Sequence, residues 1–202
     1  IINYTTLSRP ERLDRIRHSL KRVGLDANQS SRYPHMFSGG QRQRIVIARA
    51  LIVKPEIIVA DEAVSALDVS VQAQILNLIL DLKDEMAMSW IFITHDISVV
   101  NVIADRVMVL YAGRVMETGS AKDVLENPLH PYTRQLLQCV PKIGSSLKIV
   151  SAESKYGTDV AVSSEVPGCV YRNRCRLADS VCEESEPPMI SSAGHSVACF
   201  KA

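Results

Sequence analysis

Residues 57–60 (IIVA) constrain this chain most, because the run is short, continuously apolar and followed directly by two carboxylates. Runs of this kind, rich in β-branched residues and bounded by turn signals, are typical of parallel strands buried on both faces. An amphipathic helix is predicted over residues 69–88, and residues 90–93 (WIFI) predict a second buried strand. The order strand, helix, strand indicates an α/β fold with a parallel sheet.

The rest of the chain shows weaker but readable patterns. Apolar residues on one helical face, with capping residues at the ends, predict further helices over residues 9–24, 41–53, 97–104, 120–126 and 131–140. Alternation about Ala112-Gly113 predicts a hairpin of residues 106–110 and 114–118. Residues 28–37 are expected to be loop, and the Ser-rich residues 145–165 a linker. Residues 167–202 hold too few aliphatic side chains for a core of their own.

Composition narrows the function classes. Lys and Arg number 23 against 22 Asp and Glu, a net charge of +1, whereas nucleic-acid-binding proteins usually carry a basic stripe. No apolar run approaches the roughly 18 residues that a membrane-spanning helix needs. The sequence begins without a Met and without the charged and apolar regions of a signal peptide. We therefore expect a soluble, intracellular protein, cut from something longer.

Three groups of polar residues are candidates for binding a ligand or taking part in catalysis. Ser38, Gly39 and Gly40 stand directly before a predicted helix, where exposed amides and the helix dipole suit a phosphate. For these residues alone, the plainer interpretation of a loop with a serine cap is favoured. Asp61 and Glu62 follow the first predicted strand, at the sheet edge where α/β proteins bind ligands. One carboxylate there can hold Mg²⁺ through water while the other polarises an attacking water.

The third group is Thr94-His95-Asp96, which follows the second predicted strand. An imidazole at this edge can donate a hydrogen bond to a phosphate oxygen or orient a water molecule. The plain alternatives are two surface acids after a core strand and a histidine that caps a turn. Each alternative is reasonable by itself, and only the joint order of the three groups favours a site.

In that order the motifs resemble those of an ATP-binding cassette ATPase. Residues 37–44 (FSGGQRQR) are similar to its signature motif, the strand ending in Asp61-Glu62 to Walker B, residues 65–68 (SALD) to the D-loop, and His95 to the switch histidine. The resemblance covers residues 1–120. Residues 127–133 (NPLHPYT) resemble the C-terminal extension of dipeptide, oligopeptide and nickel importers. The implied fold is a P-loop NTPase-like core, N-terminally truncated, with a helical signature subdomain and a small Cys-containing extension.

The resemblance implies a role for each matched residue. Glu62 would be the catalytic base, Asp61 the carboxylate that supports Mg²⁺, and His95 the sensor of the γ-phosphate. The ATP site of an opposing subunit would be completed by Ser38, Gly39, Gly40 and Gln41, with Asp68 at the dimer seam. Ala63-Val64 departs from the commoner Pro-Thr pair after the Walker B glutamate, which should loosen the turn slightly and leave the catalytic groups in place.

The same resemblance implies a subunit that uses ATP and Mg²⁺ to energise peptide uptake across the bacterial cytoplasmic membrane. Its partners would be a second ATPase subunit, permease subunits and, indirectly, an extracytoplasmic substrate-binding protein, with no nucleic acid. It would sit peripherally on the cytoplasmic face of the inner membrane. Nickel or glutathione import and a non-catalytic truncated remnant stay open as alternatives, and residues 127–137 speak against a cassette protein of translation or repair. We expect residues 1–53 to belong to the helical signature subdomain, 54–126 to the catalytic core with its hairpin, and 127–202 to the extension.

No G-x-x-x-x-G-K-[ST] motif occurs in the sequence. That loop supplies the amides and the lysine that cradle the β- and γ-phosphates. The glutamine that couples such ATPases to their transmembrane partner is also expected upstream. We therefore predict that the isolated 202-residue chain has no measurable ATPase activity, and steady turnover sensitive to Glu62→Gln would refute this.

Four of the five cysteines fall in the last 34 residues, with gaps of five, six and sixteen residues and no C-x-x-C pair. In a reducing compartment such clustering more often indicates a metal than disulfides. The resemblance ranks a [4Fe–4S] cluster first, zinc second and four unliganded thiols third for Cys169, Cys175, Cys182 and Cys199. Arg172, Arg174 and Arg176 interleave with them and could offset an anionic site. Cys139 is predicted to pack on the apolar side of a helix.

Overall fold

The computed structural model describes residues 7–86, 88–140 and 167–202. Contacts divide the chain into two compact units, Ile1–Val99 and Val100–Ala202. The first unit contains a pair of parallel strands with helices, and the second contains an antiparallel sheet. The predicted regions 1–53, 54–126 and 127–202 are defined by function and not by contacts, so they stay a prediction.

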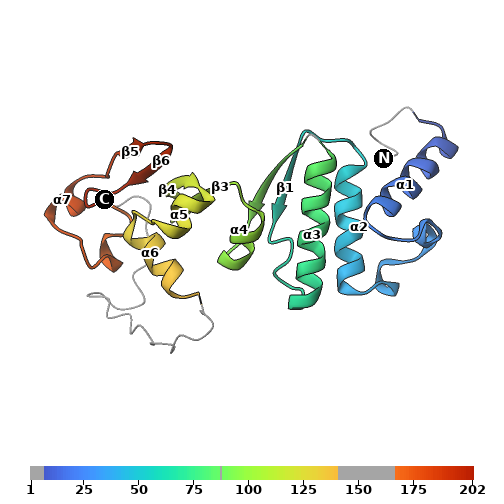
Figure 1. Cartoon of the computed structure of the whole chain (residues 1–202), viewed down its shortest axis with the longest axis horizontal. Coiled ribbons are helices and arrows are strands. Elements are labelled where there is room, and N and C mark those ends of the chain that lie inside the picture. Colours follow the sequence, from blue (N-terminus) through green and yellow to red (C-terminus); the bar gives the residue numbers. More distant parts are fainter. Residues whose placement is uncertain (1–6, 87, 141–166) are drawn as a thin grey trace. The chain divides into compact units, whose positions relative to one another are not determined.

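In the first unit, helices α2 and α3 lie beside the parallel strands (Figure 1). β1 pairs with β2 in parallel, with Ile57 opposite Ser89 and Asp61 opposite Ile93, so that the predicted order of strand, helix and strand is confirmed. The elements in chain order are α1 (Arg9–Arg22), the 3₁₀ turns Ala27–Ser31 and Pro34–Met36, α2 (Gly39–Leu51), β1 (Ile57–Asp61), α3 (Val69–Glu85), β2 (Ser89–Ile93) and the start of α4 (Ile97–Ile103).

The core of the first unit depends on one stripe of α3. Ile75, Ile79 and Leu82 are at most 1% exposed and recur at the helical spacing of four and three residues. Ile58 and Ala60 of β1 are also buried. Full burial of an aliphatic side chain of this size contributes about 1.5–3 kcal/mol. The amphipathic helix predicted over residues 69–88 is confirmed over Val69–Glu85.

The predicted burial of β1 and β2 on both faces is wrong for the described chain. Successive side chains of a strand face opposite sides of the sheet. Ile58 and Ala60 face one side, whereas Ile57 and Val59 on the other side are 57% and 60% exposed. In β2, Ile91 and Ile93 are likewise about half exposed. The sequence shows that both faces of these strands are apolar. It does not show which face another helix or strand of the described chain covers.

Arg44 holds α2 against the end of α1. Its Nη1 donates a hydrogen bond to the carbonyl oxygen of Val23 at 2.7 Å, and Val23 is the fully buried C-cap of α1. A cation is favoured here, because the carbonyl groups at a helix C-terminus carry partial negative charge. Gly24 follows with φ +73, and a Cβ on it would come within 3.0 Å of the same Nη1. The end of α1 is thus shaped around this guanidinium.

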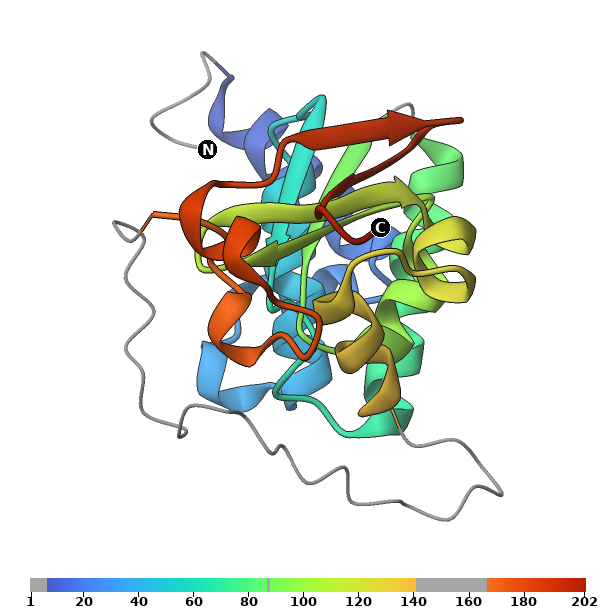
Figure 2. The same ribbon diagram turned by 90° about the vertical axis from the view of Figure 1, so that its left-hand side faces the viewer.

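The second unit is organised by a four-stranded antiparallel sheet in the order β3-β4-β6-β5. Figure 2 shows the two C-terminal strands continuing the sheet beyond β4. The elements in chain order are β3 (Arg106–Tyr111), β4 (Arg114–Ser120), α5 (Ala121–Glu126), α6 (Pro131–Gln138), the 3₁₀ turn Arg172–Arg174, α7 (Ser180–Glu184), β5 (Met189–Ser192) and β6 (His195–Ala198). The hairpin predicted about Ala112-Gly113 is confirmed, with φ of 49° and 77° as a two-residue type I′ turn requires.

The C-terminal tail shares the core of this hairpin. Met116 of β4 is buried in one cluster with Cys169, Tyr171 and Cys182. The ring of Tyr171 also lies 5.2 Å from that of Tyr111 at the end of β3, in an edge-to-face contact. This explains how a tail with few aliphatic residues is ordered. The linker predicted over residues 145–165 lies outside the described residues.

Glu117 connects three separate segments of the second unit. Its carboxylate is completely buried in β4 and accepts hydrogen bonds from the amides of Leu129 and His130, at 2.8 and 3.0 Å. The same carboxylate lies 2.7 Å from Nε2 of His195 at the start of β6. These partners offset the cost of removing a carboxylate from water. β4, the loop before α6 and β6 are thereby joined at one residue.

His130 is itself buried and caps α6. Its Nδ1 accepts a hydrogen bond from the amide of Tyr132 at 3.0 Å. Burial lowers the pKa of His130 to about 4, against a smaller opposite influence of Glu117. The ring is therefore neutral at physiological pH, with its proton on Nε2. Among residues 7–86, 88–140 and 167–202, no helix combines the length and apolar character that crossing a bilayer requires.

Candidate functional site

Glu62 and His95 meet where β1 and β2 end. The amide of Glu62 donates to the carbonyl oxygen of Ile93 at 3.0 Å, which extends the strand pairing by one residue. The Oε1 atom of Glu62 lies 2.9 Å from Nδ1 of His95. Glu62 has a φ of 49°, which is uncommon for a non-glycine residue and tends to occur at functional sites. The carboxylate and the imidazole predicted at this edge are thus in direct contact.

Each member of this pair changes the protonation of the other. Hydrogen bonding from His95, followed by that from Ser65, lowers the pKa of Glu62. Hydrogen bonding to Glu62, supported by the charge of that carboxylate, raises the pKa of His95. Both side chains are accessible to solvent, at 48% and 77% exposure. The pair can therefore exchange protons with water and meet a ligand from outside.

These pKa shifts predict a titration that NMR can follow in the 202-residue chain. The pKa of Glu62 is lowered in the folded state, so the stability that Glu62 contributes is lost as the pH falls through this lowered pKa. The pKa of His95 is raised in the folded state, so the stability that His95 contributes is lost as the pH rises through this raised pKa. The ion pair is fully formed between 4.5 and 6.5, the ordinary values of the two groups. We expect the His95 ring to titrate above 6.5 and to return toward that value in Glu62→Gln. Glu56→Gln, at the opposite end of β1, should leave the midpoint unchanged, and equal midpoints in all three proteins would contradict the contact.

Asp61 is the last residue of β1 and is exposed. Mg²⁺ usually keeps several waters and is held by one or two carboxylates together with substrate phosphates. A single exposed carboxylate beside Glu62 fits this mode, which needs no dedicated cage of protein ligands. Asp61 and Glu62 also line a groove of about 350 Å³ with Ile47 of α2 and Val59 of β1.

The turn before α2 is a complete helix cap. Ser38 is the N-cap, and its Oγ accepts from the amide of Gln41 at 3.3 Å, while Oε1 of Gln41 accepts from the amide of Ser38 at 3.1 Å. Ser38 and Gly39 are nevertheless exposed. Ser38 is therefore a helix cap, as the plainer interpretation predicted. The N-terminus of α2 also faces solvent, and anions bind favourably at such a position.

The predicted D-loop lies against this turn. A Cβ on Gly39 would be 3.6 Å from Cδ2 of Leu67, and one on Gly40 would be 2.6 Å from Cγ1 of Val71. Gly40 is thus required by close packing. Asp68 is exposed and is the N-cap residue of α3. One surface of the first unit therefore brings together the Ser38–Gln41 turn and the start of α3, while Glu62 and His95 meet at the ends of the strands.

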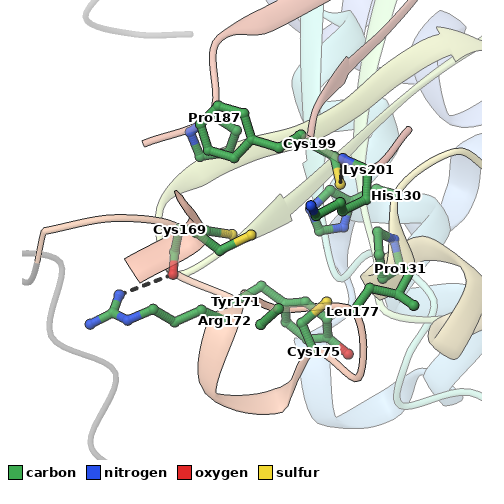
Figure 3. A pocket seen from close by; sticks show the side chains of 13 residues that line it. His130, Pro131, Cys169, Tyr171, Arg172, Cys175, Leu177, Pro187, Cys199 and Lys201 are labelled. Atoms are coloured by element: carbon green, nitrogen blue, oxygen red, sulfur yellow. Dashed lines mark hydrogen bonds between the residues drawn. The ribbon is translucent and has the colours of Figure 1, made fainter. Parts of the chain in front are cut away.

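All four tail cysteines line one small pocket of the second unit, together with His130 and Lys201 (Figure 3). Burial is the main cause that raises the pKa of the Cys169 and Cys175 thiols. Cys169 and Cys182 also meet through a 2.8 Å hydrogen bond between their backbones. The four cysteines thus share one pocket, although five to sixteen residues separate each from the next in the sequence.

This donor set suits a soft metal, but the positions of the side chains do not yet form a metal site. In the part of the chain that the structure describes, no three His, Cys, Asp or Glu side chains are placed to hold a metal ion. Of the interleaved arginines, Arg172 donates to the carbonyl oxygen of Cys169 at 3.0 Å. Cys139 is exposed just past the end of α6, so its predicted packing is wrong; the helix ends at Gln138, before its apolar stripe reaches this position.

Sequence reasoning missed Gln72 and Glu117. Gln72 donates from Nε2 to Oδ2 of Asp96 at 3.3 Å, next to His95, and no motif marked it. For Glu117 a weak signal existed in the sequence, because this glutamate alternates with Val115 in the predicted strand 114–118 and so shares the face of an apolar residue. In the structure Met116 and Glu117 are both buried, which strict alternation does not predict.

Comparison with known proteins now identifies both units. Residues 3–65 match the family described as ABC transporter, and residues 116–182 match the oligopeptide/dipeptide transporter C-terminal region. The chain is 46% identical to the dipeptide transport ATP-binding protein DppF of Haemophilus influenzae, covering 99% of this chain and 61% of that protein. It is also 46% identical to the oligopeptide transport ATP-binding protein OppF of Escherichia coli, covering 96% and 59%. The chain thus spans about three fifths of the length of these relatives.

Solved structures agree with the fold. CbiO1 of Clostridium perfringens, described as part of the ABC transporter complex cbiONQ, is 30% identical with a TM-score of 0.56, covering 62% of this chain and 50% of that one. The ATP-binding cassette MJ1267 in its ADP conformation, 24% identical over 71% of this chain and 55% of its own, has a TM-score of 0.57 and supports the fold alone. By these comparisons the chain belongs to the ABC transporter ATP-binding proteins, in the family of the dipeptide and oligopeptide transporters.

Proposed function

We propose that this chain is the part of an ATP-hydrolysing importer subunit that supplies the general base, the switch histidine and the signature turn. The 2.9 Å contact between Glu62 and His95 at the end of the parallel strands carries this proposal. The transport that the subunit energises is the uptake of di- or oligopeptides across the bacterial cytoplasmic membrane, in line with the names of the relatives.

In this mechanism Glu62 takes the proton of the attacking water. Its lowered pKa keeps the carboxylate ionised at neutral pH, as a proton acceptor must be. His95, whose pKa is raised, donates a hydrogen bond to the γ-phosphate as negative charge shifts in the transition state. Asp61 holds the Mg²⁺ of the MgATP substrate through water. The amides and lysine of a phosphate-binding loop are absent from this sequence, so complete turnover also requires groups outside these 202 residues.

The exposed turn of Ser38, Gly39, Gly40 and Gln41 completes the nucleotide site of an opposing ATPase subunit, and Asp68 lies at the seam of that dimer. The supporting observation is a capped helix N-terminus that is accessible to an anion. The further partners are permease subunits and, through them, an extracytoplasmic binding protein. We place the assembly on the cytoplasmic face of the inner membrane.

The test is transport by the full-length protein, reconstituted with its permease and binding protein in vesicles. We expect MgATP-dependent uptake of a labelled dipeptide or oligopeptide. Uptake of nickel or glutathione in place of peptides would assign a different cargo. A full-length protein that binds MgATP but neither hydrolyses it nor supports any uptake would contradict the proposal and favour the non-catalytic remnant.

We further propose, from the donor set and the shared pocket, that Cys169, Cys175, Cys182 and Cys199 hold a [4Fe–4S] cluster, with zinc as the second candidate. Binding would require the sulfur atoms to move closer together than in this structure. Anaerobically purified full-length protein should contain iron and acid-labile sulfide that are lost in Cys175→Ser and retained in Cys139→Ser, the exposed control. Zinc alone would support the second candidate, and neither metal would leave four free thiols.

A further inference from the structure

The first turn of α3 lies between two parts of the site that have separate roles. On one side, Val71 packs so closely on Gly40 that a Cβ there would be 2.6 Å from Cγ1 of Val71. Leu67, just before the helix, packs on Gly39 more loosely, because a Cβ there would be 3.6 Å from Cδ2 of Leu67, an ordinary van der Waals distance. There is no room for a Cβ at Gly40, so the backbone of the Ser38–Gln41 turn packs directly on Val71 at the start of α3.

The next residue of α3 points to the other part of the site. Nε2 of Gln72 donates to Oδ2 of Asp96 at 3.3 Å. The other carboxylate oxygen, Oδ1, accepts from the amide of Ser98 at 2.9 Å, and the amide of Asp96 donates to Oγ1 of Thr94 at 3.0 Å. Asp96 is therefore held from both sides in the loop that carries His95. Gln72 thus connects α3 to this loop through a side-chain hydrogen bond.

We propose that Gln72 is a positioning residue that couples the signature turn to the Glu62–His95 pair of the same chain. The inference rests on the proposed function, in which the turn caps the nucleotide of an opposing subunit. When that nucleotide binds against the turn, a displacement of Gly40 also displaces Val71 and the start of α3. The hydrogen bond from Gln72 to Asp96 then moves the loop that carries His95. Each chain thereby adjusts its own catalytic pair to the state of the neighbouring site. Coupling between sites is typically worth a 5- to 150-fold change in affinity.

The test compares Gln72→Ala with Gln74→Ala in the full-length protein. Gln74 is the same residue type two positions further along α3 and is exposed, so it controls for the loss of a glutamine from this helix. Loss of one side-chain hydrogen bond predicts a kcat about five- to tenfold lower for Gln72→Ala. We also expect its Hill coefficient for MgATP to fall toward 1, with an unchanged thermal midpoint. Gln74→Ala should match the wild type in all three measurements.

A second pair of variants tests the contact with the signature turn. Gly40→Ala should lower turnover because its new Cβ meets Val71, and Val71→Ala should restore part of that loss by making room. Equal kinetics of Gln72→Ala and Gln74→Ala, or a lower kcat that follows a lower thermal midpoint, would overturn the coupling, and no rescue by Val71→Ala would overturn the packing on which it depends. A wild-type protein without Glu62-dependent turnover would instead overturn the proposed function itself.

Discussion

Glu62→Gln in the full-length protein is expected to lower MgATP turnover by about a hundredfold or more, the contribution that a positioned general base makes. The amide has nearly the same shape as the carboxylate but cannot accept a proton from the attacking water. The side chain of Glu62 is 48% exposed, so the fold should be retained. Steady-state hydrolysis and equilibrium binding of MgATP, measured on the same preparation, separate loss of chemistry from loss of binding.

Glu56→Gln is the matched control for this change. Glu56 is also exposed and stands just before β1, at the end of the strand opposite to the site. Its turnover should equal that of the wild type. A Glu62→Gln protein with a kcat within a few-fold of the wild type would show that another group takes the proton, and the assignment of Glu62 as the base would then be wrong.

Glu117→Ala should be the most destabilising single change among those considered. Removing a buried acceptor typically costs about 1–3 kcal/mol in the free energy of unfolding for each buried donor that loses its partner. Here those groups are the amides of Leu129 and His130 and the ring of His195. Glu117→Gln keeps the shape and one acceptor oxygen, so its loss should be smaller.

Hydrogen exchange gives a local measurement of this effect. The amides of Leu129 and His130 should lose protection in Glu117→Ala, and urea unfolding should report the total loss of stability. Glu126→Gln, an exposed glutamate at the end of α5, provides the comparison and should change neither quantity appreciably. Unchanged protection of the two amides in Glu117→Ala would mean that the loop before α6 is held by other contacts.

Local patterns predicted most helices and the placement of Glu62 and His95 at one edge of the sheet. The inward stripe of α3 follows from helical periodicity, and the hairpin at Ala112-Gly113 follows from turn chemistry. Glu62 and His95 could be expected near each other because the carboxyl ends of paired parallel strands meet at one edge. These features depend on a few neighbouring residues or on one general rule of sheet geometry.

Features that depend on distant contacts were not accessible in the same way. The exposure of Val59 depends on which elements cover the sheet, and an apolar run carries no such information. Glu117 obtains its partners from positions 12, 13 and 78 residues away. The pocket of the four cysteines likewise appears only once α7 and the C-terminal strands are folded onto β4.

The place of β6 in its sheet has a consequence for folding. β6 lies between β4 and β5, so β5 joins the sheet only through β6. A chain in which residues 195–198 have not yet paired leaves one edge of β4 open, and such edges are prone to pair with other molecules. A folding intermediate that lacks the β4–β6 pairing should consequently be the species of this protein that aggregates most readily.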